Sequence, residues 1–439
     1  MMLKTHLLVL VVWFGLTSHA WAEGKAGTKE GPPKELRAKA EKGDADAQHS
    51  LGFMYWIGDG IPKDEAEAVK WFRKAVEQGN SKAQSDLGFM YFTGDGVPKD
   101  QAEAVKWYRK AAEQGHVGAQ LNLGVAYSNG HGVPKDETEA VKWYRKAAEQ
   151  GYVGAQHNLG FAYENGHGVP KDETEAVKWY RKAAEQGFAG SQHTLGFAYA
   201  NGHGVPKDEA EAVKWYRKAA EQGNAASQFN LGVAYENGRG VAKDGAEAVK
   251  WYRMPAGQGH IPSQVNLASM LFYEGRGVAK DEAEAAKWYR KAAERGEVSS
   301  QAQLGFIYAN GHGVPKDEVE AVKWWSKAAE NGDAESQFSL AIMYAKGRGV
   351  SKDEAEAVKW YRMAAEQGDA SAQHNLALIY SLGEGVPKDD VLAYKWILLA
   401  GAKKEKSRET IQLIEKRLTP EQRAEGQKLA REFKPVVQK

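Results

Sequence analysis

The sequence predicts an all-α protein, a right-handed α/α superhelical solenoid built from ten helix-turn-helix units. Two observations lead to this fold class. A block of 36 residues recurs ten times along the 439-residue chain, and a period in this range is typical of stacked repeat proteins. Within each block, apolar residues recur at helical spacing in two segments that a glycine-rich turn separates.

A Val-Pro-Lys-Asp segment sets the register of the repeats. Its second position recurs in steps of 36 residues, with one step of 37 between Ala242 and Ala279. The ten positions are Pro62, Pro98, Pro134, Pro170, Pro206, Ala242, Ala279, Pro315, Ser351 and Pro387. Because stacked units share one elongated core, the repeats override the two or three globular domains that the length alone would suggest.

The first 22 residues are typical of a secretory signal. An apolar run, LLVLVVWFGL, follows Lys4, and Ala20-Trp21-Ala22 matches an A-x-A cleavage site. The run is too short to span a bilayer comfortably, and no other segment is longer and as apolar. We therefore expect a signal peptide over 1–22, cleavage after Ala22, and a periplasmic or secreted protein without a membrane span after signal removal.

The remaining chain divides into three parts. Residues 23–43 are predicted to form a flexible lead-in and an N-terminal capping helix. Residues 44–404 contain the ten repeats, and residues 405–439 are predicted to form C-terminal capping helices. Terminal repeats need such covers because they would otherwise expose an apolar face.

Each repeat is predicted to contain a helix A and a helix B. In the fourth copy, helix A carries an apolar stripe of Ala155, Leu159, Ala162 and Tyr163. Gly160 lies beside this stripe. A glycine inside a helix costs roughly 0.5–1 kcal/mol relative to alanine, so a close approach of another helix is the expected compensation.

Turn and capping residues then separate the two helices. Gly166 is expected to end helix A in the left-handed conformation, and Asp172 is expected to cap helix B, with Glu175 completing a pair like a capping box. Helix B also carries a tryptophan in every copy, and we assign these large rings to the core. They are Trp71, Trp107, Trp143, Trp179, Trp215, Trp251, Trp288, Trp324, Trp360 and Trp396.

The repeat signature resembles that of a known family. The shared pattern is A-x-x-x-L-G-x-x-Y-x-x-G-x-G-V-x-x-D-x-x-x-A-x-x-W-Y-x-K-A-A-x-x-G. It is similar to the Sel-one-like repeat (SLR), a tetratricopeptide-like α/α solenoid, and the similarity covers roughly residues 44–404. The resemblance implies a secreted bacterial protein that works by holding partner proteins.

The sixth copy departs from the pattern. Where other copies contain KAAEQG, it contains Met254-Pro255-Ala256-Gly257-Gln258-Gly259, and the next helix A carries one extra residue. Proline inside a helix removes a backbone hydrogen bond at a cost of about 3 kcal/mol. One interpretation is a kink or looser joint near residues 254–275, and the other is a degenerate copy that local bulging absorbs.

Composition excludes several classes of function. Cysteine is absent, so there is no disulfide framework, thiolate metal site or cysteine nucleophile. Signal removal takes away one lysine and balances 58 basic against 58 acidic residues, which disfavours nucleic acid and anionic membranes as partners. No G-x-S-x-G, H-E-x-x-H or S-x-x-K motif occurs. We therefore predict a non-enzyme without catalytic residues.

No metal and no other cofactor is expected either. Four turns contain Gly-His-Gly, at His131, His167, His203 and His312. Equivalent residues of neighbouring repeats should stand about 8–10 Å apart, whereas a shared zinc needs both nitrogens at about 2 Å. The same turns lack the third glycine or the GK[ST] of phosphate-binding loops, so turn chemistry explains them better.

Variation inside the repeat is the remaining signal. Positions of helix A are counted here from its leading alanine or serine, such as Ala155. Positions 2 and 9 lie opposite the buried stripe on a helical wheel and vary between copies, so we expect them to be exposed on a concave face lined by A helices. The candidate partner-binding residues are Trp56, Phe92, Leu121, His157, Glu164, His193, Phe229, Glu236, Phe338 and His374. The alternative is that unconstrained positions drift.

Position 6 carries a third set of apolar residues. It is predicted to serve packing between repeats rather than binding, and it includes Phe53, Phe89, Phe161, Phe197 and Phe306.

These observations favour a monomeric interaction scaffold. The first hypothesis is an adaptor of the bacterial envelope that binds a protein or peptide on its concave face. A second is a secreted factor that binds a host protein. A third, from another class, is a hydrolase or small-molecule binder with a site assembled across repeats.

Overall fold

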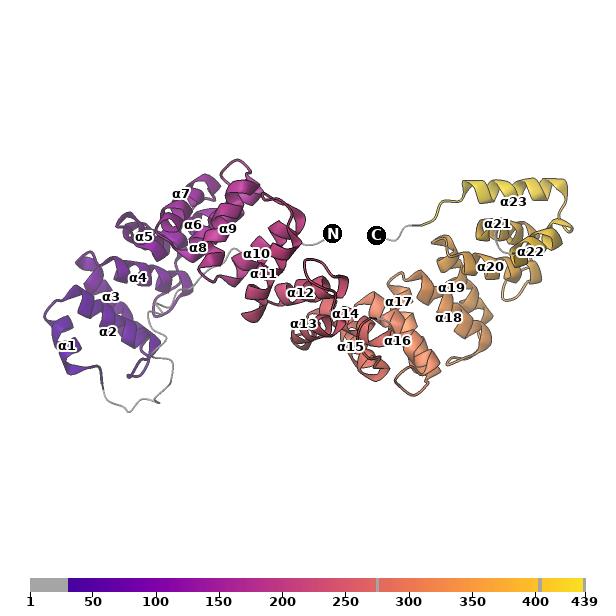
Figure 1. The fold of residues 1–439 in the computed structure, drawn as a ribbon, viewed down its shortest axis with the longest axis horizontal. Coiled ribbons are helices and arrows are strands. Elements are labelled where there is room, and N and C mark those ends of the chain that lie inside the picture. The colour runs from indigo at the N-terminus through magenta and orange to yellow at the C-terminus, as the bar shows by residue number, and fades with distance from the viewer. Residues whose placement is uncertain (1–30, 274–275, 402–404, 437–439) are drawn as a thin grey trace. The chain divides into compact units, whose positions relative to one another are not determined.

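The computed structural model describes residues 31–273, 276–401 and 405–436. The predicted signal peptide lies outside the described residues. All regular elements of the described residues are α-helices, 23 in number, so the prediction of an all-α solenoid is confirmed. The chain forms two compact units that divide between Ser227 and Gln228, and each unit is described by itself (Figure 1).

The first unit begins with a short helix and continues with five pairs of helices. Helix α1 (Lys34–Glu41) packs Leu36 and Ala40 against Leu51 and Trp71. The A helices are α2 (Ala45–Ile57), α4 (Ser81–Thr93), α6 (Val117–Asn129), α8 (Val153–Asn165) and α10 (Ala189–Asn201). The B helices are α3 (Glu65–Glu77), α5 (Gln101–Glu113), α7 (Glu137–Glu149), α9 (Glu173–Glu185) and α11 (Glu209–Glu221).

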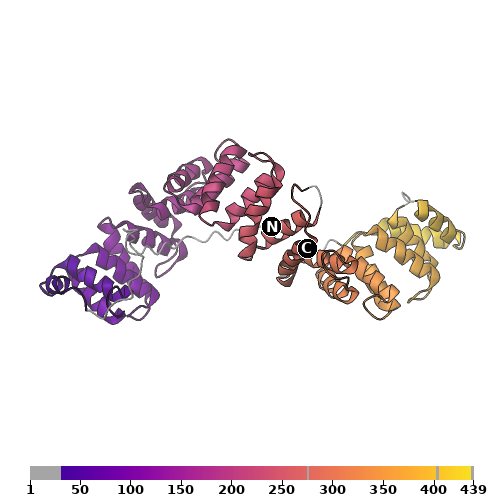
Figure 2. The ribbon, with the colours of Figure 1, turned by 60° about the horizontal axis from the view of Figure 1, so that its bottom comes forward.

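The second unit repeats the same plan; its first A helix, α12, contains the division between the units. Its A helices are α12 (Ala225–Asn237), α14 (Ile261–Phe272), α16 (Val298–Asn310), α18 (Ala334–Lys346) and α20 (Ala370–Leu382). Its B helices are α13 (Gly245–Gly257), α15 (Glu282–Glu294), α17 (Glu318–Glu330), α19 (Glu354–Glu366) and α21 (Asp390–Ala400). Two further helices, α22 (Glu405–Glu415) and α23 (Pro420–Glu432), pack on α21 (Figure 2).

Local sequence explains where the helices begin and end. Gly166 ends α8 with φ of 74°, in the left-handed region that favours glycine. Asp172 caps α9, because its side chain accepts a hydrogen bond from the Glu175 N–H at 2.9 Å. The reciprocal half of a capping box is absent here, since the Glu175 carboxylate instead accepts from Lys178 at 2.8 Å and from the Trp179 indole at 3.0 Å.

The mid-helix glycine of helix A has the predicted role. A Cβ atom on Gly160 would lie 2.9 Å from the Tyr180 ring and 3.1 Å from the Ala176 carbonyl oxygen. Helices A and B therefore approach closely at this point, and an alanine would push the ring away. The B-helix tyrosine and this glycine form one packing unit.

The tryptophans of helix B form the core, as predicted. Trp179 is buried, as are seven of its nine counterparts, while Trp107 and Trp288 are half-buried. A buried glutamine after each leading residue links the repeats in a way the sequence analysis did not foresee. Gln120, for example, donates to the Ala112 carbonyl at 3.1 Å and accepts from Gln150 of its own repeat at 2.8 Å. These bonds satisfy the amide of Gln120, whereas in Gln264 and Gln301 the side-chain nitrogen is bonded but the side-chain oxygen has no partner among the described residues.

The helices of the sixth copy and of the copy that follows it still form, despite the departures from the repeat pattern. Helix α13 continues through Pro255 to Gly257. Helix α14 ends at Phe272, and Tyr273 follows in extended conformation, where α8 has a left-handed glycine. Residues 274–275 of the predicted joint lie outside the described residues. The looser joint near residues 254–275 stays a prediction.

Candidate functional site: the A-helix face

The A-helix face is the side of the A helices that carries positions 2, 6 and 9. Positions 2 and 9 prove to lie in the seams between consecutive A helices. Trp56, at position 9 of α2, stands 5.5 Å from Phe89 of α4 between ring centroids, and its indole donates to Asp95 at 3.4 Å. His49, at position 2 of the same helix, contacts the Asp86 carboxylate at 2.8 Å. The next A helix therefore covers much of both positions.

Two predicted anchors are consequently buried. Trp56 is 8% exposed and Leu121 is 1% exposed, and Leu121 belongs to the apolar core with Tyr144 and Leu159. The expectation that these two residues are exposed is wrong. A helical wheel places them opposite the stripe of their own helix, but it omits the neighbouring A helix that packs over them.

The other predicted residues at position 2 are half-buried within the seams. His157 and His193 make 2.9 Å hydrogen bonds to Ser191 and Ser227, the leading residues of the next A helices. Phe229 packs between the rings of Tyr252 and His260, and the Phe338 ring lies 5.8 Å from that of Tyr361. His374 is half-buried as well.

The remaining residues at position 9 are also half-buried. Phe92 stands 5.7 Å from the His131 ring of the next repeat. Glu164 and Glu236 each accept a hydrogen bond at 2.8 Å from the hydroxyl of the B-helix tyrosine of their own repeat, Tyr180 and Tyr252. In these two repeats, the residue at position 9 is therefore the hydrogen-bond acceptor of the B-helix tyrosine.

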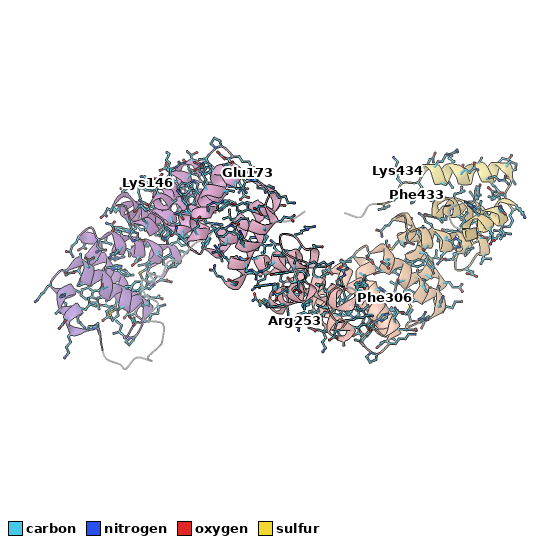
Figure 3. The ribbon with its side chains drawn as sticks, in the orientation of Figure 1. Lys146, Glu173, Arg253, Phe306, Phe433 and Lys434 are labelled. Carbon is cyan, nitrogen blue, oxygen red and sulfur yellow. The ribbon has the colours of Figure 1, made fainter. Side chains whose placement is uncertain are left out.

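Position 6 is the open ridge of the A-helix face, because it lies between two seams. Phe197 is 43% exposed, Phe306 44% and Leu378 37% (Phe306 is labelled in Figure 3). Phe53 and Phe89 are partly buried against the core of the first two repeats. Phe306 packs between repeats as predicted, since its ring centroid lies 6.4 Å from that of Phe272 in the preceding A helix, although much of its side chain is exposed. For Phe197 the prediction is wrong, because its ring contacts His203 of its own repeat and the side chain is exposed. The recurrence of these phenylalanines in register with the variable positions was the sequence signal for this ridge.

The Gly-His-Gly histidines pack against the ridge. His167 and His203 stand edge-to-face with Phe161 and Phe197, in both cases 5.6 Å between ring centroids. His312 stacks on Phe306 at 5.4 Å. No group of three or more metal-ligating side chains occurs among the described residues, and the ring contacts give these histidines a packing role.

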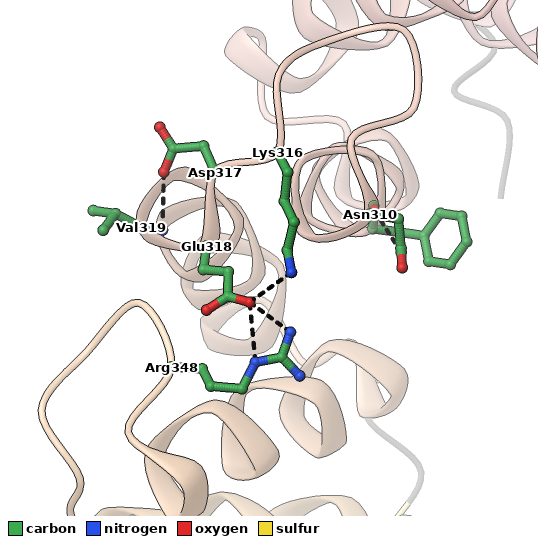
Figure 4. Close-up of polar contacts among 7 residues, drawn as sticks. Asn310, Lys316, Asp317, Glu318, Val319 and Arg348 are labelled. Atoms are coloured by element: carbon green, nitrogen blue, oxygen red, sulfur yellow. Dashed lines mark hydrogen bonds and ion pairs between the residues drawn. The ribbon is translucent and has the colours of Figure 1, made fainter.

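The residue between the two turn glycines, such as His312 or Arg348, also contacts the glutamate at the start of helix B in the preceding repeat. Figure 4 shows this contact at Glu318, which accepts from Arg348 of the next repeat at 2.6 Å and from Lys316 at 3.1 Å. The hydrogen bond from Arg348, followed by that from Lys316, lowers the pKa of Glu318 to about 2. His312 makes the equivalent contact with Glu282 at 3.2 Å.

Small clefts open on the A-helix face at three equivalent seams. Each is lined by position 9 and the B-helix tyrosine of one repeat and by positions 3, 6 and 12 of the next. The clefts in the seam between the third and fourth repeats (seam 3/4) and in the seam between the fourth and fifth (seam 4/5) are shallow, with cavity volumes of only about 10 and 20 Å³. The third cleft lies between Ala345, Tyr361 and Leu378 in the second unit.

Comparison with known protein families identifies the repeat. A profile of the Sel1 repeat matches ten consecutive segments, which together cover residues 45–404.

The chain belongs to the Sel1 repeat family.

Two solved structures support this assignment. A protective antigen present in uropathogenic Escherichia coli strains, which displays an SLR fold, is 39% identical; the match covers 92% of this chain and 94% of that one, with a TM-score of 0.52. A Sel1 repeat protein from Oxalobacter formigenes is 34% identical over 71% of this chain and 91% of that one, with a TM-score of 0.55. A search of curated proteins finds no match.

Sel1 repeats are protein-interaction modules, and proteins built from them are typically non-enzymatic scaffolds. Across the part of the chain that the structure describes, no helix combines the length and the apolar character needed to cross a membrane.

Proposed function

We propose that this protein is a non-catalytic scaffold of the bacterial envelope that binds a protein or peptide along its A-helix face. The observation that carries the proposal is the ridge at position 6. Phe197 in the first unit and Phe306 and Leu378 in the second expose large apolar side chains at equivalent places in their repeats. Exposed aromatic side chains next to buried neighbours are typical anchors for a partner.

The B helices do not repeat such a ridge: Met254 and Val319 are exposed on described B helices, but the equivalent residues in their neighbouring repeats are lysine or alanine. Their outward positions carry lysines and glutamates that pair along the helix, for example Lys178 with Glu175 and Lys214 with Glu211, both at 2.8 Å. Such exposed pairs contribute little to binding and favour contact with water. The contrast between the two helices of one repeat supports the A helix as the binding element.

The periplasmic or secreted location supports the envelope assignment. It rests on the signal-like N-terminus with its expected cleavage after Ala22, and two bacterial Sel1 repeat proteins are similar over most of the chain. A secreted factor that binds a host protein is the second candidate. The similarity to a protective antigen of uropathogenic strains favours it, since a protective antigen is accessible to host antibodies.

Partner capture with matched variants tests the proposal. The mature chain from Glu23 is used as bait against envelope extract of the source bacterium and, separately, against host fluid. Replacing Phe161 and Phe197 by serine should abolish capture of a stoichiometric partner while the circular-dichroism melting curve stays cooperative. Replacing Lys178 and Lys214 by serine, on helix B of the same repeats, should leave capture intact.

The source of the captured partner separates the two candidates. A partner found only in the envelope extract supports the adaptor, and one found only in host fluid supports the secreted factor. Loss of capture by the lysine variant with retention by the phenylalanine variant would overturn the assignment to the A-helix face.

A further inference from the structure

The largest of the three clefts on the A-helix face lies in the second unit, at the seam between the ninth and tenth repeats (seam 9/10). Its cavity volume is about 250 Å³, whereas those at seams 3/4 and 4/5 are about 10 and 20 Å³. Position 9 is Ala345, whose single methyl group leaves this space open. The cleft is also lined by Leu378 of the ridge, which is 37% exposed.

One wall of the cleft at seam 9/10 is mainly apolar. The Tyr361 ring forms part of this wall and is 5% exposed. Burial raises the pKa of Tyr361, and a side-chain hydrogen bond with Asn375 partly offsets this rise. Because the phenol already has a partner, a bound side chain gains from this wall mainly by burying apolar surface. The aliphatic residues of the wall are Ala345, Ala357, Val358, Leu378 and Ile379.

The polar lining of the same cleft is negatively charged. Glu354, at the start of α19, and Glu384, between the two turn glycines, both line the cleft, together with Lys352. Lys352 pairs with Glu354 at 2.7 Å. Among the described residues, Glu384 forms no ion pair of its own. Two carboxylates against one ammonium group leave the lining with one negative charge in excess.

The seam between the eighth and ninth repeats (seam 8/9) shows the more usual arrangement. There the turn residue is Arg348, whose Nε and Nη2 donate to the Glu318 carboxylate at 3.0 and 2.6 Å (Figure 4). The Glu318 side chain is 27% exposed, whereas that of Glu354 is 47% exposed. At seam 9/10, Glu384 stands in the place of the arginine, so a second carboxylate replaces the guanidinium.

Seam 1/2, between the first two repeats, also has an acidic turn residue, and there the chain supplies a donor. Asp95 stands in the place of Glu384. Position 9 is Trp56, which is 8% exposed and whose indole N–H donates to Asp95 at 3.4 Å. A large side chain with an N–H donor therefore packs into this seam. At seam 9/10, the equivalent Ala345 provides neither the bulk nor the donor.

We propose that the cleft at seam 9/10 binds an arginine side chain of the partner. The aliphatic stem lies against the apolar wall, and the guanidinium donates hydrogen bonds to the carboxylates of Glu354 and Glu384. Arginine is the occupant because its apolar stem and its positively charged, planar fork of donors match the two parts of the lining. The inference rests on the proposed function and adds a basic residue to the partner.

Three short peptides test this inference on the mature full-length chain. They are acetyl-Ala-Ala-Arg-Ala-Ala-amide and the same peptide with citrulline or lysine in the centre; citrulline keeps the shape of arginine without its charge. Binding is followed by NMR at the 13C-labelled δ1-methyl group of Ile379, which lines the cleft. The arginine peptide should shift this resonance and bind roughly fivefold to tenfold more tightly than the citrulline peptide.

Two variants locate the site, and a third is their matched control. Ala345→Trp should fill the cleft as Trp56 fills seam 1/2, and should abolish binding of the arginine peptide. Glu384→Arg should restore the arrangement seen at Arg348 and abolish the preference for arginine over citrulline, with the melting temperature unchanged or raised. Asp95→Arg makes the same charge change at the equivalent turn of the second repeat and should leave the preference intact.

Equal binding of the arginine and citrulline peptides, no shift of the Ile379 resonance by the arginine peptide, or a preference that survives in Glu384→Arg would each overturn the inference. Loss of the preference in Asp95→Arg would also overturn it, because the effect would then be one of overall charge. Tighter binding of the lysine peptide would overturn the assignment to arginine. The proposed function would fail separately, if capture of the partner did not depend on Phe161 and Phe197.

Discussion

Seam 3/4 and seam 4/5 share most of their scaffold and differ at two positions, with Ser128 against Glu164 at position 9 and Asn158 against Thr194 at position 3. Both contain a B-helix tyrosine packed on the glycine of helix A, an acidic residue at the start of helix B, and a phenylalanine that contacts a histidine of the next turn. In seam 4/5 the Glu164 carboxylate accepts a hydrogen bond from Tyr180, whereas in seam 3/4 the hydrogen-bond neighbours of Tyr144 are the uncharged Ser128 and Asn158. A repeat scaffold can therefore alter its binding surface one seam at a time while its core stays fixed.

The largest effect on stability is expected at a turn glycine that both seams contain. Gly168 and Gly204 have φ of 70° and 66°, and a Cβ on either would overlap the backbone carbonyl of Glu137 or Glu173 in the preceding helix B. Gly168→Ala and Gly204→Ala should each lower the free energy of unfolding by about 3 kcal/mol, through backbone strain and steric overlap. Urea denaturation measures this.

A matched control separates strain from overlap. Gly187 also has a positive φ, of 93°, but a Cβ there would meet nothing within 4 Å. Gly187→Ala should cost only about 1–2 kcal/mol. Equal costs for Gly187 and Gly204 would show that the turn does not dock tightly on the preceding helix.

Removing the tyrosine hydroxyl should distinguish the two seams. Tyr180→Phe leaves the Glu164 carboxylate without its donor and should lower the free energy of unfolding by about 1–2 kcal/mol. Tyr144→Phe removes a hydroxyl whose neighbours, Ser128 and Asn158, are uncharged, and should cost less, about 0.5 kcal/mol. Equal losses in both variants would mean that the charge of Glu164 adds nothing to its hydrogen bond with Tyr180.

A smaller, pH-dependent effect is expected at the start of helix A in the third repeat. His116 caps α6, because its Nδ1 accepts from the Ala119 N–H at 3.2 Å, and burial lowers the pKa of His116. The unfolded chain therefore binds the proton more tightly. The contribution of His116 to stability is complete above about pH 6.5, the ordinary value for histidine, and is lost as the pH falls below it.

The equivalent cap in the second repeat provides the matched substitution. Asn80 accepts from the Ala83 N–H at 2.9 Å and does not titrate. His116→Asn should match the unsubstituted protein at pH 7.5 and exceed its stability at pH 5 by up to about 1 kcal/mol. Urea denaturation at the two pH values measures the difference, and parallel curves for both proteins would contradict a titrating cap.

The helices and their core could be predicted from the sequence, because those features depend on local chemistry and on spacing along one helix. Asp172, Gly160, Gly166 and Trp179 all have the structural environment that the repeat implied. The capping box at Glu175 failed because Lys178 and the indole compete for its carboxylate.

The binding surface was harder to predict, because it depends on neighbouring repeats. Trp56 and Leu121 are variable on the wheel of a single helix, but the next A helix buries them. The exposed ridge at Phe197 was mistaken for packing for the same reason. Seam 3/4 combines Tyr144 with Asn158 of the following repeat, a pairing that only the stacked structure brings together.

Site-specific photo-crosslinking tests the assignment of the A-helix face most directly. A benzophenone amino acid placed at position 197, on the ridge, should form crosslinks to the captured partner. The same amino acid at position 214, on the outward side of α11, should form none. Crosslinks from position 214 with none from position 197 would contradict the assignment of partner binding to the A-helix face.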